Sequence, residues 1–277
     1  MPGGDFQLTE AEFDRIRELV REHTGISLSE AKRQLVYGRL SRRLRALKLS
    51  GFHEYIELLE QGEPDELEEF TNAVTTNLTS FFREPHHFEY LAKELLPKRV
   101  AQDSGAHRLR LWCCAASTGE EPYSISMVLR EAAPLLTGWD VKLLATDLDS
   151  NVLATGAAGV YGVDRFQTMA QKRLNDWFEP ADGAAKRYSA VDELRSLITF
   201  RQLNLMHEWP MKGPFDAIFC RNVVIYFDKP TQRTLFERMA KLQRPGDHLF
   251  LGHSESLYRV SDKYDLIGKT IYRRNDA

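Results

Sequence analysis

A turn of the kind that binds nucleotides carries two carboxylates in the segment AASTGEEPYS, residues 115–124. The preceding apolar run LRLWCC predicts a strand, and the residues after the turn predict a helix. Turns that bind phosphate close backbone N–H groups on the anion and carry further glycines or a lysine. Because Gly119 is followed directly by Glu120 and Glu121, the pattern disfavours a phosphorylated ligand.

A third carboxylate, Asp147, ends the next predicted strand, VKLLATD. An acidic side chain at this position can accept hydrogen bonds from ribose hydroxyls. A ribose beside an acidic turn fits S-adenosylmethionine, whose sulfonium and amino groups are cationic and would be attracted by Glu120. The structural alternative is that acidic residues at strand ends cap the following helix, as Asp149 before SNVL is placed to do. The pattern alone leaves both interpretations open.

The composition is that of a globular protein with one large domain or two unequal ones. The chain has 277 residues, 43% of them hydrophobic and 28% charged. Its net charge of -3 argues against a general nucleic-acid binder. We expect no signal peptide and no membrane-spanning helix, because no apolar run approaches about 20 residues. The cysteines, Cys113, Cys114 and Cys220, lack the spacing of a metal site or a disulfide framework, so we expect a reducing cytoplasm.

The pattern along the chain changes between its two parts. The first 85 residues predict helices, one beginning at the N-cap Thr9 and ending at Gly25, one from Ser29, and one over 64–82. From residue 108, strands alternate with helices, which predicts a largely parallel sheet with helices on both faces. The strand ends near 114, 147 and 222 should lie side by side. Residues 157–200 interrupt the alternation and predict a small antiparallel excursion.

Four motifs resemble one known family: AASTGEEPYS, NLTSFFREPHHF, CRNVVIYFDK and LGHSES. They are similar to the CheR family of chemoreceptor glutamate O-methyltransferases of bacterial chemotaxis, and the resemblance covers nearly the whole chain. It implies an α/β fold, with a Rossmann-like class I methyltransferase domain (86–277), a small β-subdomain inserted within about 157–200, and an all-helical receptor-docking domain (1–85). It also implies methyl transfer from S-adenosylmethionine to receptor glutamates in the cytoplasm, giving γ-methyl esters and S-adenosylhomocysteine.

The resemblance assigns the site position by position. The implied cofactor contacts are Asn77, Thr79, Arg83, Glu120, Asp147, Asn204, Leu205, Arg221 and Asn222. Arg83 is expected to orient a carboxylate near the methyl group, unless it forms a surface ion pair with Glu84. Tyr226 is expected to shape the transfer pocket, unless it is only a packed aromatic. No general base is needed, because a glutamate with a pKa near 4.3 is ionised at neutral pH.

A basic helix is the expected receptor contact. Seven basic residues and no acidic one lie between Lys32 and Lys48. At helical spacing, Val36, Leu40, Leu44 and Leu47 form an apolar stripe beside the basic face. The basic face could instead pair with the acidic stretch over 54–70. The resemblance favours docking to the cytoplasmic domain of chemoreceptors, and the expected contacts are Arg39, Arg42, Arg43 and Arg45.

Further partners and two rival functions follow from the same residues. Some family members tether a receptor C-terminal peptide through a Gly- and Arg-containing loop, for which DGAAKRYS offers Gly183, Lys186 and Arg187; this stays open. One rival is a methyltransferase for a small molecule or RNA. The other is a non-catalytic adaptor, against which the retained site residues argue. We expect a monomer without nucleic acid, direct membrane insertion or metal, since the adjacent His86 and His87 should point apart on a helix.

Overall fold

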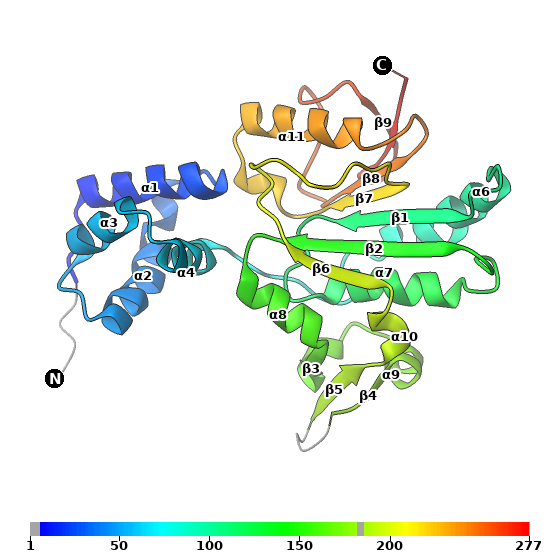
Figure 1. The fold of residues 1–277 in the computed structure, drawn as a ribbon, viewed down its shortest axis with the longest axis horizontal. Coiled ribbons are helices and arrows are strands. Elements are labelled where there is room, and N and C mark those ends of the chain that lie inside the picture. The colour runs from blue at the N-terminus through cyan, green and yellow to red at the C-terminus, as the bar shows by residue number, and fades with distance from the viewer. Residues whose placement is uncertain (1–5, 182–185, 277) are drawn as a thin grey trace.

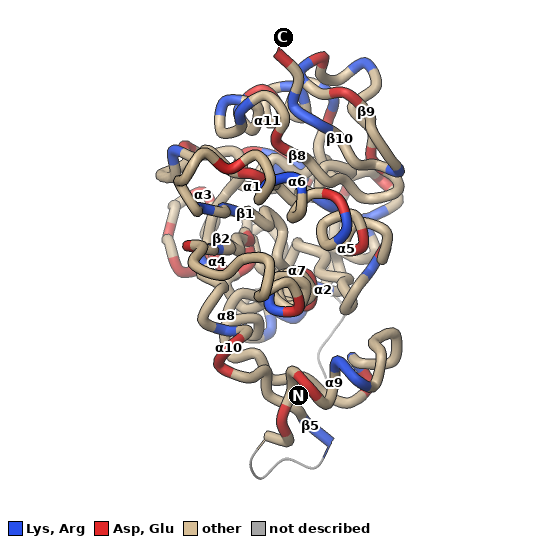
Figure 2. The backbone as a smooth tube through the Cα atoms, turned by 90° about the vertical axis from the view of Figure 1, so that its right-hand side faces the viewer, with Lys and Arg blue, Asp and Glu red and all other residues tan. Residues whose placement is uncertain are grey.

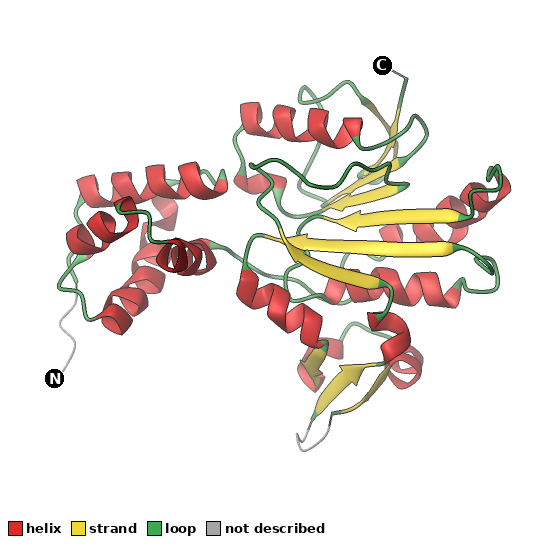
Figure 3. Cartoon of the chain, in the orientation of Figure 1, coloured by secondary structure: helices red, strands yellow, loops and turns green. Residues whose placement is uncertain are grey.

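A computed structural model describes residues 6–181 and 186–276. Figures 1 and 3 show a helical part on one side and a sheet covered by helices on the other, joined by an extended linker. A smaller sheet projects from the α/β part at the end of α8. The carboxyl ends of the parallel strands face the helical part. The two parts therefore meet at the edge of the sheet where parallel sheets bind ligands.

The helical part is built from short amphipathic helices around one apolar core. Its elements are α1 (Glu10–Thr24), η1 (Glu30–Lys32), α2 (Arg33–Leu47), α3 (Phe52–Glu60) and α4 (Pro64–Val74). As predicted, α1 starts with a capping box, in which Thr9 and Glu12 bond each other's backbone N–H groups, and it ends at Gly25. The fully buried Phe13, Leu40 and Phe52 join the helices in one cluster. The short helix α3 lies in the acidic stretch and was not predicted.

The predicted helix over 64–82 is wrong beyond Val74. Helix α4 ends there, and Thr75 is extended, with φ -69° and ψ 156°. The Thr75 hydroxyl donates to Asp149 Oδ2 (2.7 Å), and so does the Asn77 amide (2.7 Å). Thr and Asn side chains that bond outside the helix compete with helical backbone pairing. Residues 75–80 therefore form the linker that joins the helical part to the sheet.

The central sheet has seven strands in the order β6-β2-β1-β7-β8-β10-β9. Neighbouring strands from β6 to β8 are parallel, and β10 and β9 close the sheet as an antiparallel hairpin. The strands are β1 (Arg108–Cys113), β2 (Asp140–Asp147), β6 (Ile198–Gln202), β7 (Ala217–Cys220), β8 (His248–Leu251), β9 (Tyr264–Gly268) and β10 (Ile271–Arg274). The predicted adjacency of β2, β1 and β7 is confirmed, but β6 belongs to this sheet and not to the antiparallel excursion.

Helices cover both faces of this sheet, as predicted. Alternate residues of β1 face opposite sides: Leu111 packs with the core under α7, whereas Trp112 packs with the core under α11. The three cysteines are buried free thiols. The covering elements are α5 (His86–Tyr90), η2 (Leu91–Leu95), α6 (Leu96–Ala101), α7 (Glu120–Glu131), α8 (Ser150–Ala158), α10 (Asp192–Arg195), η4 (Val224–Tyr226) and α11 (Lys229–Lys241).

The small sheet lies within the predicted insertion. Its order is β3-β5-β4, with antiparallel pairing throughout. Lys186 and Arg187 lie at the start of its central strand, whereas Gly183 falls outside the described residues. The elements are β3 (Val160–Gly162), η3 (Val163–Phe166), α9 (Gln171–Trp177), β4 (Phe178–Pro180) and β5 (Arg187–Ala190).

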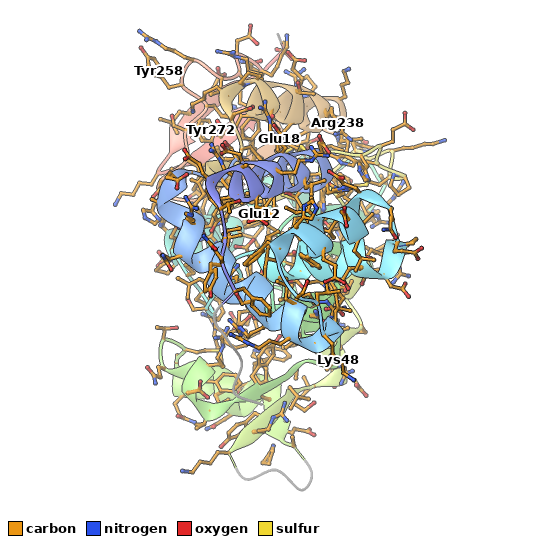
Figure 4. The ribbon with its side chains drawn as sticks, turned by 90° about the vertical axis from the view of Figure 1, so that its left-hand side faces the viewer. Glu12, Glu18, Lys48, Arg238, Tyr258 and Tyr272 are labelled. Atoms are coloured by element: carbon orange, nitrogen blue, oxygen red, sulfur yellow. The ribbon has the colours of Figure 1, made fainter. Side chains whose placement is uncertain are left out.

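Several polar contacts hold the two parts together. Arg21 Nη2 lies 2.8 Å from Asp228 Oδ2, and the Ser27 N–H donates to the Tyr226 carbonyl (2.8 Å). Figure 4 looks onto this helical part, with Glu12 and Glu18 marking α1. Gly25 allows the closest approach: with φ 74°, a Cβ there would lie 2.4 Å from the Met206 sulfur. The junction therefore requires a glycine at the end of α1.

Charges of both signs are interspersed over the described residues on the far side of the α/β part (Figure 2). No helix in the described part of the chain is both long and apolar enough to cross a membrane.

Part of the basic helix α2 packs and bonds within the helical part itself. Val36, Leu40 and Leu44 are fully buried, as the predicted stripe requires. Arg43 donates through Nε and Nη2 to the buried carboxylate of Glu66 (2.8 and 2.6 Å). The Tyr55 hydroxyl donates to the same carboxylate (2.8 Å). The alternative that basic residues pair with the acidic stretch is thus confirmed for Arg43, and its assignment as a receptor contact stays a prediction.

We expect Glu66→Ala to destabilise the protein by about 3 kcal/mol, because it leaves the Tyr55 hydroxyl and the Arg43 guanidinium without their acceptor. Glu69→Ala is the matched control: its carboxylate lies 3.5 Å from Arg43 but its side chain is 47% exposed, so the expected loss is below about 0.5 kcal/mol. Urea denaturation of both variants measures the difference. Equal losses would contradict the role given to the buried carboxylate.

Candidate functional site

A pocket lies between the two domains at the carboxyl ends of β1, β2 and β7. The helical part contributes Thr24 and Ile26, and the linker contributes residues 75–79. Parallel sheets bind ligands at this edge because the connections diverge there. The remaining lining residues come from the linker end and the strand ends: Arg83, Cys114, Ala115, Ser117, Glu121, Asp147, Leu148, Leu203, Asn204, Leu205, Arg221, Asn222, Val223, Tyr226 and Phe227.

A wider groove at the opposite end of the sheet has a different character. It is lined by charges that neutralise each other: Asp216 Oδ1 lies 2.7 Å from Arg99 Nε and 2.6 Å from Arg244 Nη2. These ion pairs fasten α6 and the turn before β8 to the sheet. We therefore place the candidate site in the pocket between the domains.

The structure brings the predicted site residues together with one exception. Every predicted cofactor contact except Glu120 lines the pocket, and so does Tyr226. The Glu120 carboxylate is fully buried and pairs with Arg165, whose Nε lies 2.8 Å from Oε1. Glu121 takes the place facing the pocket. Neighbouring residues at the start of α7 point about 100° apart, so only one of the two carboxylates can face the ligand.

Asp147 connects the end of β2 to the turn after β1. Its Oδ2 accepts a hydrogen bond from the Ser117 N–H (2.7 Å), and its Oδ1 accepts one from the Asp149 N–H (3.1 Å). Burial raises the pKa of Asp147 to about 6, and these backbone donors oppose the rise only in part. The side chain is placed to accept further hydrogen bonds from a ligand in the pocket.

Asp149 has the predicted capping role and a second one. Its Oδ1 accepts hydrogen bonds from the Asn151 and Val152 N–H groups at the start of α8. Its Oδ2 accepts those from Thr75 and Asn77 in the linker. The second role fixes Asn77 at the pocket. Sequence gave no signal for it, because the contact joins residues more than seventy positions apart.

Arg221 is the buried cation of the site. It pairs with Glu121 and donates through Nη2 to the Arg83 carbonyl (2.5 Å). Its Nη2 also lies 3.5 Å from Glu84 Oε2. Glu84 accepts a hydrogen bond from His253 as well (2.9 Å). Arg221 thus links the acidic turn to the segment that carries Arg83.

Glu84 pairs with Arg221 and His253, and the predicted alternative of an Arg83–Glu84 ion pair is not made. Burial disfavours the charged carboxylate, but the His253 hydrogen bond and the Arg221 charge outweigh it and lower the pKa of Glu84 to about 2. Phe82 and Glu84 both have left-handed backbones, with φ 52° and 58°. Such conformations cost energy and persist only where the surroundings enforce them. The Arg221 pairing supplies that constraint.

The expectation that His86 and His87 point apart is wrong. Their ring centroids are only 4.1 Å apart, because both Nε2 atoms contact the same carbonyl, that of Lys269 (3.0 and 3.2 Å). Glu84, His86 and His87 are close enough to hold a metal ion. However, the Glu84 carboxylate already pairs with the Arg221 guanidinium, and this positive charge would repel a metal ion. Burial lowers the pKa of His87 to about 3, so this side chain is neutral.

Arg83 and Tyr226 line the pocket, and each is held by a hydrogen bond: Arg83 through its side chain and Tyr226 through its backbone. Arg83 is half-buried, and its Nη1 donates to the Leu78 carbonyl (2.9 Å). The Tyr226 carbonyl is held by Ser27 from the helical part. The Asn204 side chain donates through Nδ2 to the His23 carbonyl (2.6 Å) and accepts through Oδ1 from the Met206 N–H (2.9 Å). Because both of its polar atoms are bonded within the protein, Asn204 forms part of the pocket wall.

The polar and apolar groups of the pocket fit S-adenosylmethionine. Asp147 offers an acceptor for ribose hydroxyls and Arg83 a guanidinium for a carboxylate, while the Glu121 carboxylate at the pocket is paired with Arg221. Apolar side chains complete the lining where a flat base can pack: Ile26, Leu148, Leu203, Leu205 and Val223. Glu121 was present in the sequence motif beside Glu120, but only the helix orientation distinguishes the two.

Comparison with known proteins gives matches over the whole length. A family model described as "CheR methyltransferase, all-alpha domain" matches residues 11–75, and one described as "CheR methyltransferase, SAM binding domain" matches residues 77–273. Chemotaxis protein methyltransferase 2 of Pseudomonas aeruginosa is 48% identical, covering 97% of this chain and 94% of its own. A probable chemotaxis protein methyltransferase of Rhizobium etli is 43% identical (92% and 96%), and the Escherichia coli chemotaxis protein methyltransferase is 41% identical (96% and 91%).

We expect cofactor affinity to fall below pH 6. The pKa of Asp147 is raised to about 6 by burial, so lowering the pH from 7.5 to 5 protonates it and replaces a charged acceptor for the ribose hydroxyls by a weaker, neutral one. The dissociation constant of S-adenosylhomocysteine, measured by titration calorimetry, should rise about tenfold over that range. Asp147→Asn should bind weakly at both pH values. An affinity that does not change with pH in the unmodified protein would contradict this role of Asp147.

Proposed function

The chain belongs to the CheR methyltransferase family, and on that basis we propose that it methylates glutamate side chains of chemoreceptors. It is an S-adenosylmethionine-dependent methyltransferase of chemotaxis adaptation. In this proposal residues 1–85 dock the receptor, and residues 86–277 carry the chemistry. The observation that carries the proposal is the position of Arg83: it is a half-buried guanidinium that lines the pocket, whereas the pocket's other guanidinium, Arg221, is buried and paired with Glu121.

When bound, S-adenosylmethionine supplies an electrophilic methyl group on a sulfonium. The proposed contacts to this cofactor include Asp147, Glu121 and Asn77. Arg83 and Tyr226 line the same pocket. An incoming glutamate is already ionised, so the site needs no base to take a proton. A carboxylate oxygen bonds to the methyl carbon as the carbon–sulfur bond breaks, giving the ester and S-adenosylhomocysteine with no proton transferred.

Positioning is therefore what the enzyme must supply. Holding two reactants in line is worth up to about 7–11 kcal/mol of the barrier. Arg83 is suited to this because its guanidinium can orient a carboxylate and its own backbone carbonyl is anchored by the buried Arg221. Tyr226 is fixed from the other side by the Ser27 contact. The strained segment at Phe82 and Glu84 thus presents Arg83 in a defined place.

The proposed receptor contact is the exposed part of the basic helix. Arg42 and Arg45 are exposed, whereas Arg43 is held by Glu66 and Arg39 donates to the carbonyls of Ala73 and Thr75. A groove next to this helix is lined by Arg39, Arg42 and Arg43. We assign steering of an acidic receptor segment to Arg42 and Arg45, with Arg39 between them and the pocket. Exposed charges act mainly on alignment and rate of encounter.

Two further points concern partners. A receptor C-terminal peptide is proposed at the small sheet, where Lys186 and Arg187 are exposed. The rival of an RNA methyltransferase would use the basic helix for phosphates, and the bonds that Arg43 and Arg39 make within the domain remove two of its seven cations from that role.

Arg83→Ala should lower kcat/KM for the receptor about 100-fold, because the carboxylate is no longer held in line. Labelled S-adenosylmethionine and the cytoplasmic fragment of a chemoreceptor from the same bacterium measure this, with label released as methanol at high pH. Arg83→Lys should recover only part of the rate. The control is Arg108→Ala, at the opposite end of β1. Label that resists alkali would contradict ester formation, and an unchanged Arg83→Ala rate would contradict its role.

Charge reversal on the basic helix should act through salt-sensitive docking. In the double variant Arg42→Glu, Arg45→Glu, we expect KM for the receptor fragment to rise about tenfold at low ionic strength, and the difference from the unmodified protein to shrink at 0.5 M salt, about the concentration at which screening removes exposed pairs. Lys241→Glu, on the exposed side of α11, serves as the control. An effect that is independent of salt would contradict electrostatic steering.

A further inference from the structure

Leu78 is a large apolar residue that lines the pocket and is exposed to solvent. It is 78% exposed, more than any other exposed large hydrophobic side chain among the described residues. It is also the only one of that exposed group, within the described part of the chain, that lines the pocket. Single exposed hydrophobic residues are common and need no explanation. The position beside Arg83 is what makes this one informative.

The backbone around Leu78 is held in place on both sides. The Leu78 carbonyl accepts a hydrogen bond from Arg83 Nη1 (2.9 Å), and the Asn77 carbonyl accepts one from the Ser117 hydroxyl (3.0 Å). The Asn77 amide is bonded to Asp149. Leu78 is therefore presented outward from a fixed loop, and little ordering entropy remains to be lost when a partner covers it.

Leu78 also lies next to a basic surface. Thr75 lines both the pocket and the groove formed by Arg39, Arg42 and Arg43, so the groove and the pocket meet at the linker. From the arginines of the groove the path crosses the uncharged linker residues 75–77 and reaches Leu78, whose carbonyl accepts a hydrogen bond from the Arg83 guanidinium. A partner that follows this path must carry negative charge and an apolar contact close to the carboxylate that reacts.

We propose that Leu78 is a docking contact for the substrate, and that it packs on an apolar side chain close to the target glutamate. The occupant is an acidic segment of the receptor, because the groove that meets the pocket at Thr75 is lined by arginines. This inference rests on the proposed function. It assigns substrate selection to the linker, in addition to the charged helix α2, and makes Leu78 selective for glutamates with apolar neighbours.

The test compares Leu78→Ala with Leu266→Ala, a control that removes a leucine of similar exposure, 63%, from the edge strand β9. We expect Leu78→Ala to raise KM for the chemoreceptor cytoplasmic fragment about tenfold, from the apolar area no longer buried. Leu78→Met should restore most of the affinity, since it keeps apolar area. The dissociation constant of S-adenosylhomocysteine should change less than about twofold, and Leu266→Ala should match the unmodified protein.

The possible outcomes separate this inference from the proposed function. If the unmodified protein places no alkali-labile methyl on the receptor fragment, the proposed function itself fails. If it does, and Leu78→Ala has the KM of Leu266→Ala, the docking role of Leu78 is overturned. It is overturned equally if Leu78→Ala weakens S-adenosylhomocysteine binding as much as receptor binding, because Leu78 would then be part of the cofactor wall.

Discussion

The two oxygens of the Asp149 carboxylate hold the site together. One oxygen accepts hydrogen bonds from the N–H groups that start α8, and the other accepts those from Thr75 and Asn77. The sheet and the linker are therefore joined by one buried side chain, which is 3% exposed. Because the linker also bears Leu78, and Arg83 follows directly after it, the geometry of the pocket depends on this contact.

A second set of contacts fixes the other end of the same segment. Arg221 pairs with Glu121 on the turn and with Glu84 next to Arg83. Each partner alone would be an expensive buried charge, but together they satisfy each other. The strained backbone at Phe82 and Glu84 is the local cost of this arrangement. Its consequence is that the Arg83 guanidinium is held at the pocket between the two parts.

The adjacency of three strand ends and the helical N-terminal part were predictable, because strand ends and capping residues carry local signals, whereas most pocket residues were assigned through the resemblance to a known family. What failed depended on contacts distant in sequence. Thr75 and Asn77 leave the predicted helix to bond Asp149. Glu120 turns toward Arg165 in the inserted region, which leaves Glu121 at the pocket. Arg43 forms an ion pair with the buried Glu66. In each case a tertiary polar contact overrides the local pattern.

The identity of the methylated group is the most direct test of the account. Tandem mass spectrometry of the chemoreceptor fragment, after reaction with the protein and S-adenosylmethionine, places the added methyl on an individual side chain. The account predicts methyl on glutamate carboxyl groups with an apolar side chain nearby. Methyl found on a nitrogen or sulfur atom, or on glutamates without an apolar neighbour, would contradict it.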